Sequence, residues 1–197
     1  MGELDSRPCE GIEWQEKLKT RLFPVHRLDE EVTGILLFAK SDIAHREASL
    51  WFENRQISKS YEALTEAKAG AYEIGKVLTW KSKLLRGKKR AYEKDFGKPS
   101  VTESEFLGAG FVKDSWFWRL KPVTGRPHQL RFEMYKHQHP VLGDVLYGAE
   151  APWGSSLGIA LRAVRLDLSG CDARERYGLP LELKVDSLHE WFKRHQK

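Results

Sequence analysis

Short strand-like segments outnumber helical segments along this chain, and that imbalance limits most strongly how it can fold. Many of these segments are joined by short turns rather than by long helical connections. Parallel strands need a crossover of a dozen or more residues, usually a helix. The pattern therefore predicts an α+β fold with a mixed, mostly antiparallel central β-sheet flanked by helices. We expect strands at residues 34–40, 57–66, 73–80, 101–107, 115–123, 158–168 and 181–185.

Helical character is confined to three segments. We expect a short helix at residues 11–22, a second helix that begins after Ser41, and a closing helix at residues 187–196. Ser41 can cap the second helix, because a serine side chain accepts a hydrogen bond from a backbone N–H of the first turn. The apolar residues of this helix recur at the spacing of one buried face. They are Ala44, Ala48, Trp51 and Phe52.

The length and composition predict one domain that spans residues 1–197. The 197 residues contain no internal repeat, no low-complexity tract and no linker rich in proline or glycine. No apolar run approaches the ~18 residues that cross a bilayer, and the first residues lack the features of a secretory signal. The two cysteines, Cys9 and Cys171, cannot form a disulfide framework or a four-cysteine zinc site. We expect a cytoplasmic monomer that does not bind membranes.

Positive charge is concentrated in one place, the basic segment at residues 76–98. This segment holds nine lysines and arginines against two acidic residues, a net charge of +7 in a chain whose total is +5. Such a patch favours binding to a polyanion, because neutralising phosphates releases counterions. A solvated, lysine-rich loop would have the same composition. Three interleaved aromatic residues could stack on bases or anchor the segment to the core: Trp80, Tyr92 and Phe96.

Two further segments gather polar residues of the kind that carry chemistry. The first, at residues 26–34, places His26, Arg27 and Asp29 just before an apolar run. The second, at residues 124–148, contains several histidines with a nearby aspartate, but their spacing does not match the usual zinc sites. The chain lacks the glycine-rich phosphate and dinucleotide motifs, the zinc-deaminase motif and G-x-S-x-G. These absences weigh against an NTPase, a dinucleotide enzyme, a zinc deaminase and a serine hydrolase of that type.

Five collinear segments resemble the motifs of the RluA-type pseudouridine synthases. HRLDEEVTGILLFAK (26–40) resembles the catalytic motif H-R-L-D-x-x-T-S-G-L-L-L-x-A-K, and KSYEAL (59–64) resembles the K-x-Y-x-A strand. GKPSVTESEF (97–106), GRPHQLRFEMYKHQHPVLGDVLYG (125–148) and LRAVRLDL (161–168) resemble later motifs of the family in the same order. The resemblance implies the pseudouridine synthase catalytic fold and isomerisation of uridine to pseudouridine in rRNA or tRNA. It implies no metal, no redox cofactor and no energy donor.

The resemblance also implies catalytic roles. Asp29 matches the catalytic aspartate, which acts as a nucleophile at the sugar carbon or as a base at the neighbouring carbon. Arg131 is the expected partner of that carboxylate, since a paired guanidinium favours the ionised form. Tyr61 matches the family tyrosine that stacks on the target uracil and helps to move a proton. The other polar residues around Arg131 are expected to be scaffold: His128, Gln129 and Asp144.

The expected substrate contacts lie around these residues. Arg27 resembles the family arginine that fills the space left by the extruded nucleotide, and Leu161 is expected to line the pocket beneath Tyr61. Lysines and arginines are better suited to contact the RNA backbone than to specify bases. The expected backbone contacts are Lys59, Lys88, Lys89 and Arg90.

The sequence also departs from the family pattern. Positions 32–34 read Val-Thr-Gly, position 127 is proline and position 162 is arginine. The family's N-terminal strand with Asn-Lys-Pro-x-Gly and an appended N-terminal RNA-binding domain are not found. These departures motivate the alternative of a non-catalytic RNA-binding protein on the same fold. A hydrolase of small nucleosides is a third possibility, but it would have no use for the basic segment.

Overall fold

A computed structural model describes residues 10–68, 72–151, 153–154 and 158–195. The chain divides into two compact units, one formed by residues 1–28 and 36–56 and the other by residues 29–35 and 57–197. In the described residues no helix combines the length and the apolar character needed to cross a membrane. Cys9 lies outside the described residues.

The first unit is small and built from two helices and a pair of short strands. Its elements are α1 (Glu10–Leu18), β1 (Phe23–Pro24), β3 (Phe38–Ala39) and α2 (Asp42–Glu53). The prediction for α2 is confirmed, because Ser41 caps it by accepting a hydrogen bond from the backbone N–H of Ala44 at 3.2 Å. Ala48 and Trp51 are its buried residues. Helix α1 ends earlier than predicted, and Lys19 just beyond it adopts a left-handed backbone with φ 49°.

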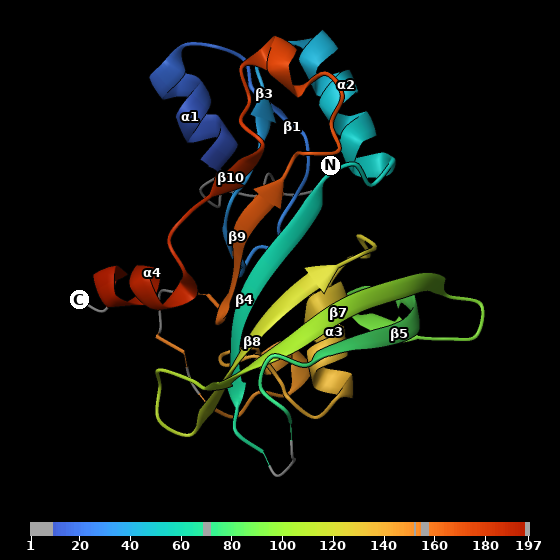
Figure 1. Cartoon of the computed structure of the whole chain (residues 1–197), viewed down its shortest axis with the longest axis vertical. Coiled ribbons are helices and arrows are strands. Elements are labelled where there is room, and N and C mark those ends of the chain that lie inside the picture. Colours follow the sequence, from blue (N-terminus) through green and yellow to red (C-terminus); the bar gives the residue numbers. More distant parts are fainter. Residues whose placement is uncertain (1–9, 69–71, 152, 155–157, 196–197) are drawn as a thin grey trace. The chain divides into compact units, whose positions relative to one another are not determined.

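The second unit is organised around an eight-stranded sheet (Figure 1). The strand order is β10-β9-β4-β8-β7-β5-β6, and β2 pairs with β9 off this path. Only the pairing of β2 with β9 is parallel; every other pairing is antiparallel. The strands are β2 (Thr33–Gly34), β4 (Ser58–Glu66), β5 (Val77–Arg86), β6 (Ala91–Glu93), β7 (Lys98–Ala109), β8 (Ser115–Pro122), β9 (Leu161–Asp167) and β10 (Glu182–Lys184). The predicted α+β class with a mostly antiparallel sheet is confirmed.

Two α-helices and two short 3-10 helices complete the second unit. They are α3 (Gln129–Lys136), α4 (Leu188–His195) and the 3-10 turns Val145–Tyr147 and Arg174–Tyr177. Helix α3 contacts β5, β6, β7 and β8, and in Figure 1 it lies behind these strands. Trp118 of β8 is fully buried and donates its indole N–H to Thr65 of β4 at 3.0 Å. This packing places the N-terminus of α3 over one face of the sheet.

The predicted strand at residues 34–40 is wrong. The apolar run is divided between two short strands, β2 and β3, that belong to different units. Gly34 has φ 120°, and a Cβ at this position would collide with the backbone of Ala163. The chain therefore runs beside β9 for two residues and then leaves it, and the side chain of His26 accepts a hydrogen bond from the N–H of Leu37 at 3.1 Å.

The basic segment forms strands rather than a solvated loop. Strand β5 extends to Arg86, and a turn at residues 87–90 connects it to β6. Along β5 the buried residues Trp80, Ser82 and Leu84 alternate with exposed lysines, which is the period of a strand with one face on the core. Trp80 stacks on His137 with ring centroids 4.1 Å apart, so it belongs to the core and is not free to stack on bases. Tyr92 and Phe96 are exposed.

Candidate active site

The centre of the site is the guanidinium of Arg131, which α3 carries into the interior. Its side chain is 1% exposed. Nε donates to Oδ2 of Asp144 at 2.7 Å, and Nη2 donates to Oδ1 at 2.8 Å. This two-point pairing fixes the plane of the guanidinium. Asp144 is equally buried and precedes the 3-10 turn Val145–Tyr147, so it anchors Arg131 as the sequence predicted for a scaffold residue.

The remaining edge of the guanidinium faces the loop that carries Asp29. Nη1 of Arg131 lies 3.8 Å from Oδ2 of Asp29 and donates to Oε2 of Glu31 at 2.7 Å. The predicted pairing of Arg131 with Asp29 is therefore present as a longer ion pair, while the hydrogen bonds of Arg131 go to Asp144 and Glu31. Sequence reasoning missed Glu31. Its only signal was its position two residues after the aspartate.

Three carboxylates thus surround one buried guanidinium. Burial alone would lower the pKa of Arg131, but the hydrogen bonds and charges of Asp144 and Glu31 outweigh burial and raise it. Burial likewise opposes ionisation of Glu31, yet a backbone hydrogen bond and the charge of Arg131 lower its pKa. The side chain of Asp29 is 19% exposed, so its carboxylate is still open to solvent beside the fixed positive charge.

Strand β4 brings Tyr61 toward the same carboxylate. Tyr61 is paired with Ala163 of β9, and Ala63 is paired with Leu161, so the side chains of Tyr61 and Leu161 lie on the same face of the sheet. Tyr61 is 8% exposed. Burial, and next the negative charge of Asp29, raise the pKa of the Tyr61 phenol. It is therefore a neutral hydroxyl at physiological pH.

His128 completes the surroundings of Asp29. It immediately precedes α3, and its Nε2 lies 4.0 Å from Oδ1 of Asp29. Burial is the largest influence on the His128 imidazole and lowers its pKa. Gln129 is also buried and, as expected for scaffold, bonds to β7 through Val101 and Thr102 at 2.9 Å.

The predicted RNA contacts lie farther from this cluster. Lys88, Lys89 and Arg90 are exposed at the turn of residues 87–90. Lys59 of β4 is half-buried, and burial lowers the pKa of its ammonium. Arg27 is exposed and belongs to the first unit, whereas the carboxylate cluster belongs to the second unit, so its role stays a prediction.

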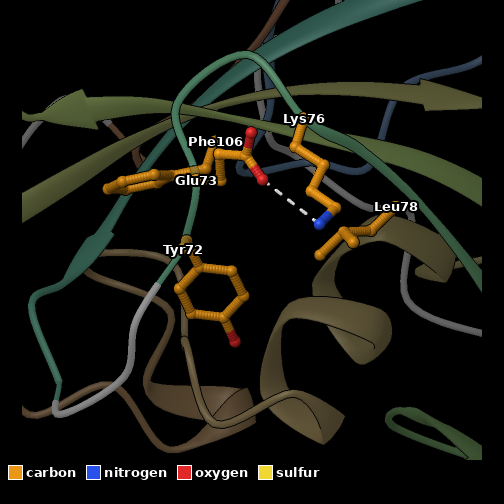
Figure 2. A pocket seen from close by; sticks show the side chains of 5 residues that line it. All are labelled: Tyr72, Glu73, Lys76, Leu78 and Phe106. Carbon is orange, nitrogen blue, oxygen red and sulfur yellow. Dashed lines mark hydrogen bonds and ion pairs between the residues drawn. The ribbon is translucent and has the colours of Figure 1, made fainter.

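A separate pocket opens in the second unit, away from the predicted site residues (Figure 2). Its volume is about 500 Å³. One ion pair between two of its residues, Lys76 and Glu73 at 3.2 Å, bridges part of its wall. The pocket contains none of the residues that the sequence assigned to catalysis or RNA contact. It is lined by Tyr72, Glu73, Lys76, Leu78 and Phe106.

No group of three or more histidine, cysteine, aspartate or glutamate side chains within the described ranges is arranged to hold a metal ion. The carboxylates that meet near Asp29 are directed at the guanidinium of Arg131, which supplies the positive charge of the site.

Comparison with known proteins gives a consistent set of matches. The sequence model of the RNA pseudouridylate synthase family matches residues 5–136. The chain is 35% identical over 147 residues to the dual-specificity RNA pseudouridine synthase RluA of Pasteurella multocida, which covers 73% of this chain and 65% of that protein. It is 32% identical over 146 residues to tRNA pseudouridine synthase C of the same organism, covering 68% of this chain and 59% of the relative.

A third relative is ribosomal large subunit pseudouridine synthase D of Vibrio vulnificus, 35% identical over 134 residues. That match covers 67% of this chain and 40% of the relative, so the matched region spans less than two thirds of each of these three relatives. Among solved structures, human RNA Pseudouridylate Synthase Domain Containing 1 has a TM-score of 0.73 at 24% identity. It covers 89% of this chain and 72% of that structure, a likeness of fold.

Proposed function

The chain belongs to the RNA pseudouridylate synthase family, and from this premise we propose that it isomerises uridines in rRNA or tRNA to pseudouridine. The observation that carries the proposal is a partly exposed carboxylate, Asp29, held 3.8 Å from a buried arginine in the motif that the family resemblance assigns to catalysis. The relatives named for rRNA and tRNA support the substrate class.

The reaction exchanges one bond to the sugar for another. The N1–C1′ bond of uridine breaks, the uracil turns, and C5 bonds to C1′. The C5 proton is lost and N1 gains a proton, so the atoms of substrate and product are the same. Asp29 acts either by attacking C1′ or by taking a proton from C2′, and both roles require the ionised carboxylate. The charge of Arg131 favours that ionised form.

Tyr61 and Leu161 would receive the uracil. Because its phenol stays neutral, Tyr61 offers a flat ring for stacking and a hydroxyl that can pass a proton. Leu161 lies on the same face of the sheet and would form the apolar floor below the base. Arg27 would occupy the gap in the RNA that the extruded nucleotide leaves, offsetting part of the cost of a few kcal/mol for flipping.

The turn at residues 87–90 would hold the RNA backbone. Lys88, Lys89 and Arg90 are exposed together there, and Lys59 adds a further positive charge nearer to Tyr61 on β4. Contacts of this kind supply affinity that falls steeply with salt, without selecting bases. We further propose that both compact units belong to one catalytic domain, which works as a monomer in the cytoplasm. Size-exclusion chromatography with light scattering tests the monomer.

Pseudouridine-specific chemical mapping tests the proposal. RNA from a strain that lacks the gene should lose pseudouridine at one or a few sites, and the purified protein should restore them in vitro. If every pseudouridine persists after deletion and the protein is inactive on total RNA while binding it, the chain is a non-catalytic RNA-binding protein. Activity on free uridine monophosphate that is insensitive to salt would instead indicate a small-molecule hydrolase.

A further inference from the structure

A chain of polar contacts connects the turn at residues 87–90 to the catalytic aspartate. The backbone N–H of Ala91, the first residue after that turn, donates to Oη of Tyr147 at 2.7 Å. The same hydroxyl lies 3.2 Å from Nδ1 of His128. The other nitrogen of this imidazole, Nε2, lies 4.0 Å from Oδ1 of Asp29. Three contacts therefore lead from the proposed RNA-binding turn to the proposed reaction centre.

The hydrogen-bond accounting of Tyr147 fixes the proton on His128. Tyr147 is 1% exposed, so its hydroxyl proton needs an acceptor inside the protein. Since the oxygen already accepts from Ala91, the O–H is free to donate, and the unprotonated Nδ1 of His128 is the acceptor that it meets. The single ring proton of the neutral imidazole is then on Nε2, which faces the carboxylate of Asp29. Burial lowers the pKa of His128 and so agrees with the neutral ring.

The backbone of His128 is held in a conformation that needs external support. Its φ of 53° and ψ of 21° lie in the left-handed region, which costs a non-glycine residue energy. Its side chain makes no capping hydrogen bond to the helix that follows. Strain of this kind persists where the surroundings over-determine the geometry, and it concentrates at functional sites. The conformation therefore serves the direction of the imidazole.

We propose that His128 is a positioning residue that directs Nε2–H at the carboxylate of Asp29, and that Tyr147 ties its orientation to the backbone of the RNA-binding turn. This inference rests on the proposed function. The 4.0 Å separation is a distance before substrate binding, and catalytic hydrogen bonds often shorten only in the bound complex. RNA held by Lys88–Arg90 fixes Ala91, and through Tyr147 it fixes the imidazole that orients the carboxylate.

Removing the Tyr147 hydroxyl separates this role from RNA binding. Tyr147→Phe and Tyr135→Phe make the same chemical change on neighbouring rings, whose centroids lie 6.1 Å apart. The Tyr135 side chain is 42% exposed, and its hydroxyl makes no hydrogen bond to the described residues. Total RNA from a deletion strain serves as probe in single-turnover reactions with protein in excess. Tyr147→Phe should lower the maximal rate about tenfold with a half-saturating concentration near that of the native protein, and Tyr135→Phe should change neither.

Two substitutions at His128 distinguish positioning from a purely structural role. Glutamine places its amide N–H near the position of Nε2, whereas asparagine reaches only as far as Nδ1. Asparagine, however, tolerates the left-handed backbone better. If His128 positions Asp29, His128→Gln retains more activity than His128→Asn; a structural role predicts the opposite order.

The protonation state can be measured without any activity. Nitrogen-15 NMR of histidine-labelled protein should show the Nε2–H tautomer of His128, and this tautomer should lose population in Tyr147→Phe. The inference is overturned by an Nδ1–H tautomer in the native protein, or by a Tyr147→Phe rate equal to that of Tyr135→Phe. A native protein that forms no pseudouridine would instead overturn the proposed function on which the inference rests.

Discussion

Replacing Asp144 by asparagine tests whether one buried ion pair holds the site together. The side chains of Asp144 and Arg131 are both 1% exposed and are joined by hydrogen bonds of 2.7 and 2.8 Å. Asparagine keeps the shape but removes the charge, and it turns an N–H group toward the guanidinium. Removing one partner of a buried pair costs about 3–5 kcal/mol, because the other charge stays buried. We expect the lower end of this range, since Glu31 still contacts Arg131.

Glu31→Gln is the matched control, because it neutralises the other carboxylate that bonds to the same guanidinium. The Glu31 side chain is 41% exposed, so solvent screens its interaction and the expected cost is at most about 1 kcal/mol. Urea unfolding at neutral pH, followed by circular dichroism and by tryptophan fluorescence, measures both free energies of unfolding. A domain has only about 5–15 kcal/mol in total, so the difference is readily detected. An Asp144→Asn protein as stable as Glu31→Gln would refute the reasoning.

Three further predictions follow from the electrostatics. Reversing the three basic charges of the turn at residues 87–90 should weaken RNA binding and flatten its salt dependence by about 0.7 per lost phosphate contact; an unchanged slope would make the turn a bystander surface. The folded-state pKa of Glu31 is lowered, so its ionisation stabilises the fold above its unfolded pKa of about 4.3, and this contribution is lost as the pH falls through the folded pKa. Native protein should therefore lose stability more steeply than Glu31→Gln below about pH 5 in urea titrations. Because burial and Asp29 raise the pKa of Tyr61, the single-turnover rate should show no limb from tyrosine ionisation between about pH 8 and pH 10, and such a limb that disappears in Tyr61→Phe would contradict the assignment.

Local patterns predicted much of the fold. The cap at Ser41 and the apolar face of α2 depend on residues within a few positions of one another, and both are found. The strand predicted at 57–66 is found at Ser58–Glu66, and that at 115–123 is found at Ser115–Pro122. The closing helix ends at His195, and residue 196 lies outside the described residues.

Helix α3 could not be predicted, because burial removes the pattern by which a surface helix is recognised. Six of its eight residues are buried, including Arg131 and Glu133. Charged residues in such a sequence suggest a solvent-facing side, whereas here Arg131 faces two carboxylates and the raised pKa of Glu133 reflects its burial. The role of Asp144 as an anchor for Arg131 was nevertheless expected from the motif.

Contacts between distant parts of the chain explain the other differences. Glu31 and Arg131 are 100 residues apart, so no local pattern indicates that they meet. The extension of β5 to Arg86 was visible in the alternation of apolar and lysine residues, but the concentration of charge favoured a loop. The division of residues 34–40 follows from the close approach of Gly34 to β9, which only the assembled sheet reveals.

The central claim is that an ionised Asp29 beside Arg131 carries the reaction. Asp29→Asn and Asp29→Ala proteins, shown by urea unfolding to keep the native fold, should form no detectable pseudouridine in total RNA from a deletion strain while still binding that RNA. The native protein under the same conditions should restore the missing sites. Full turnover by a correctly folded Asp29→Ala protein would contradict the account.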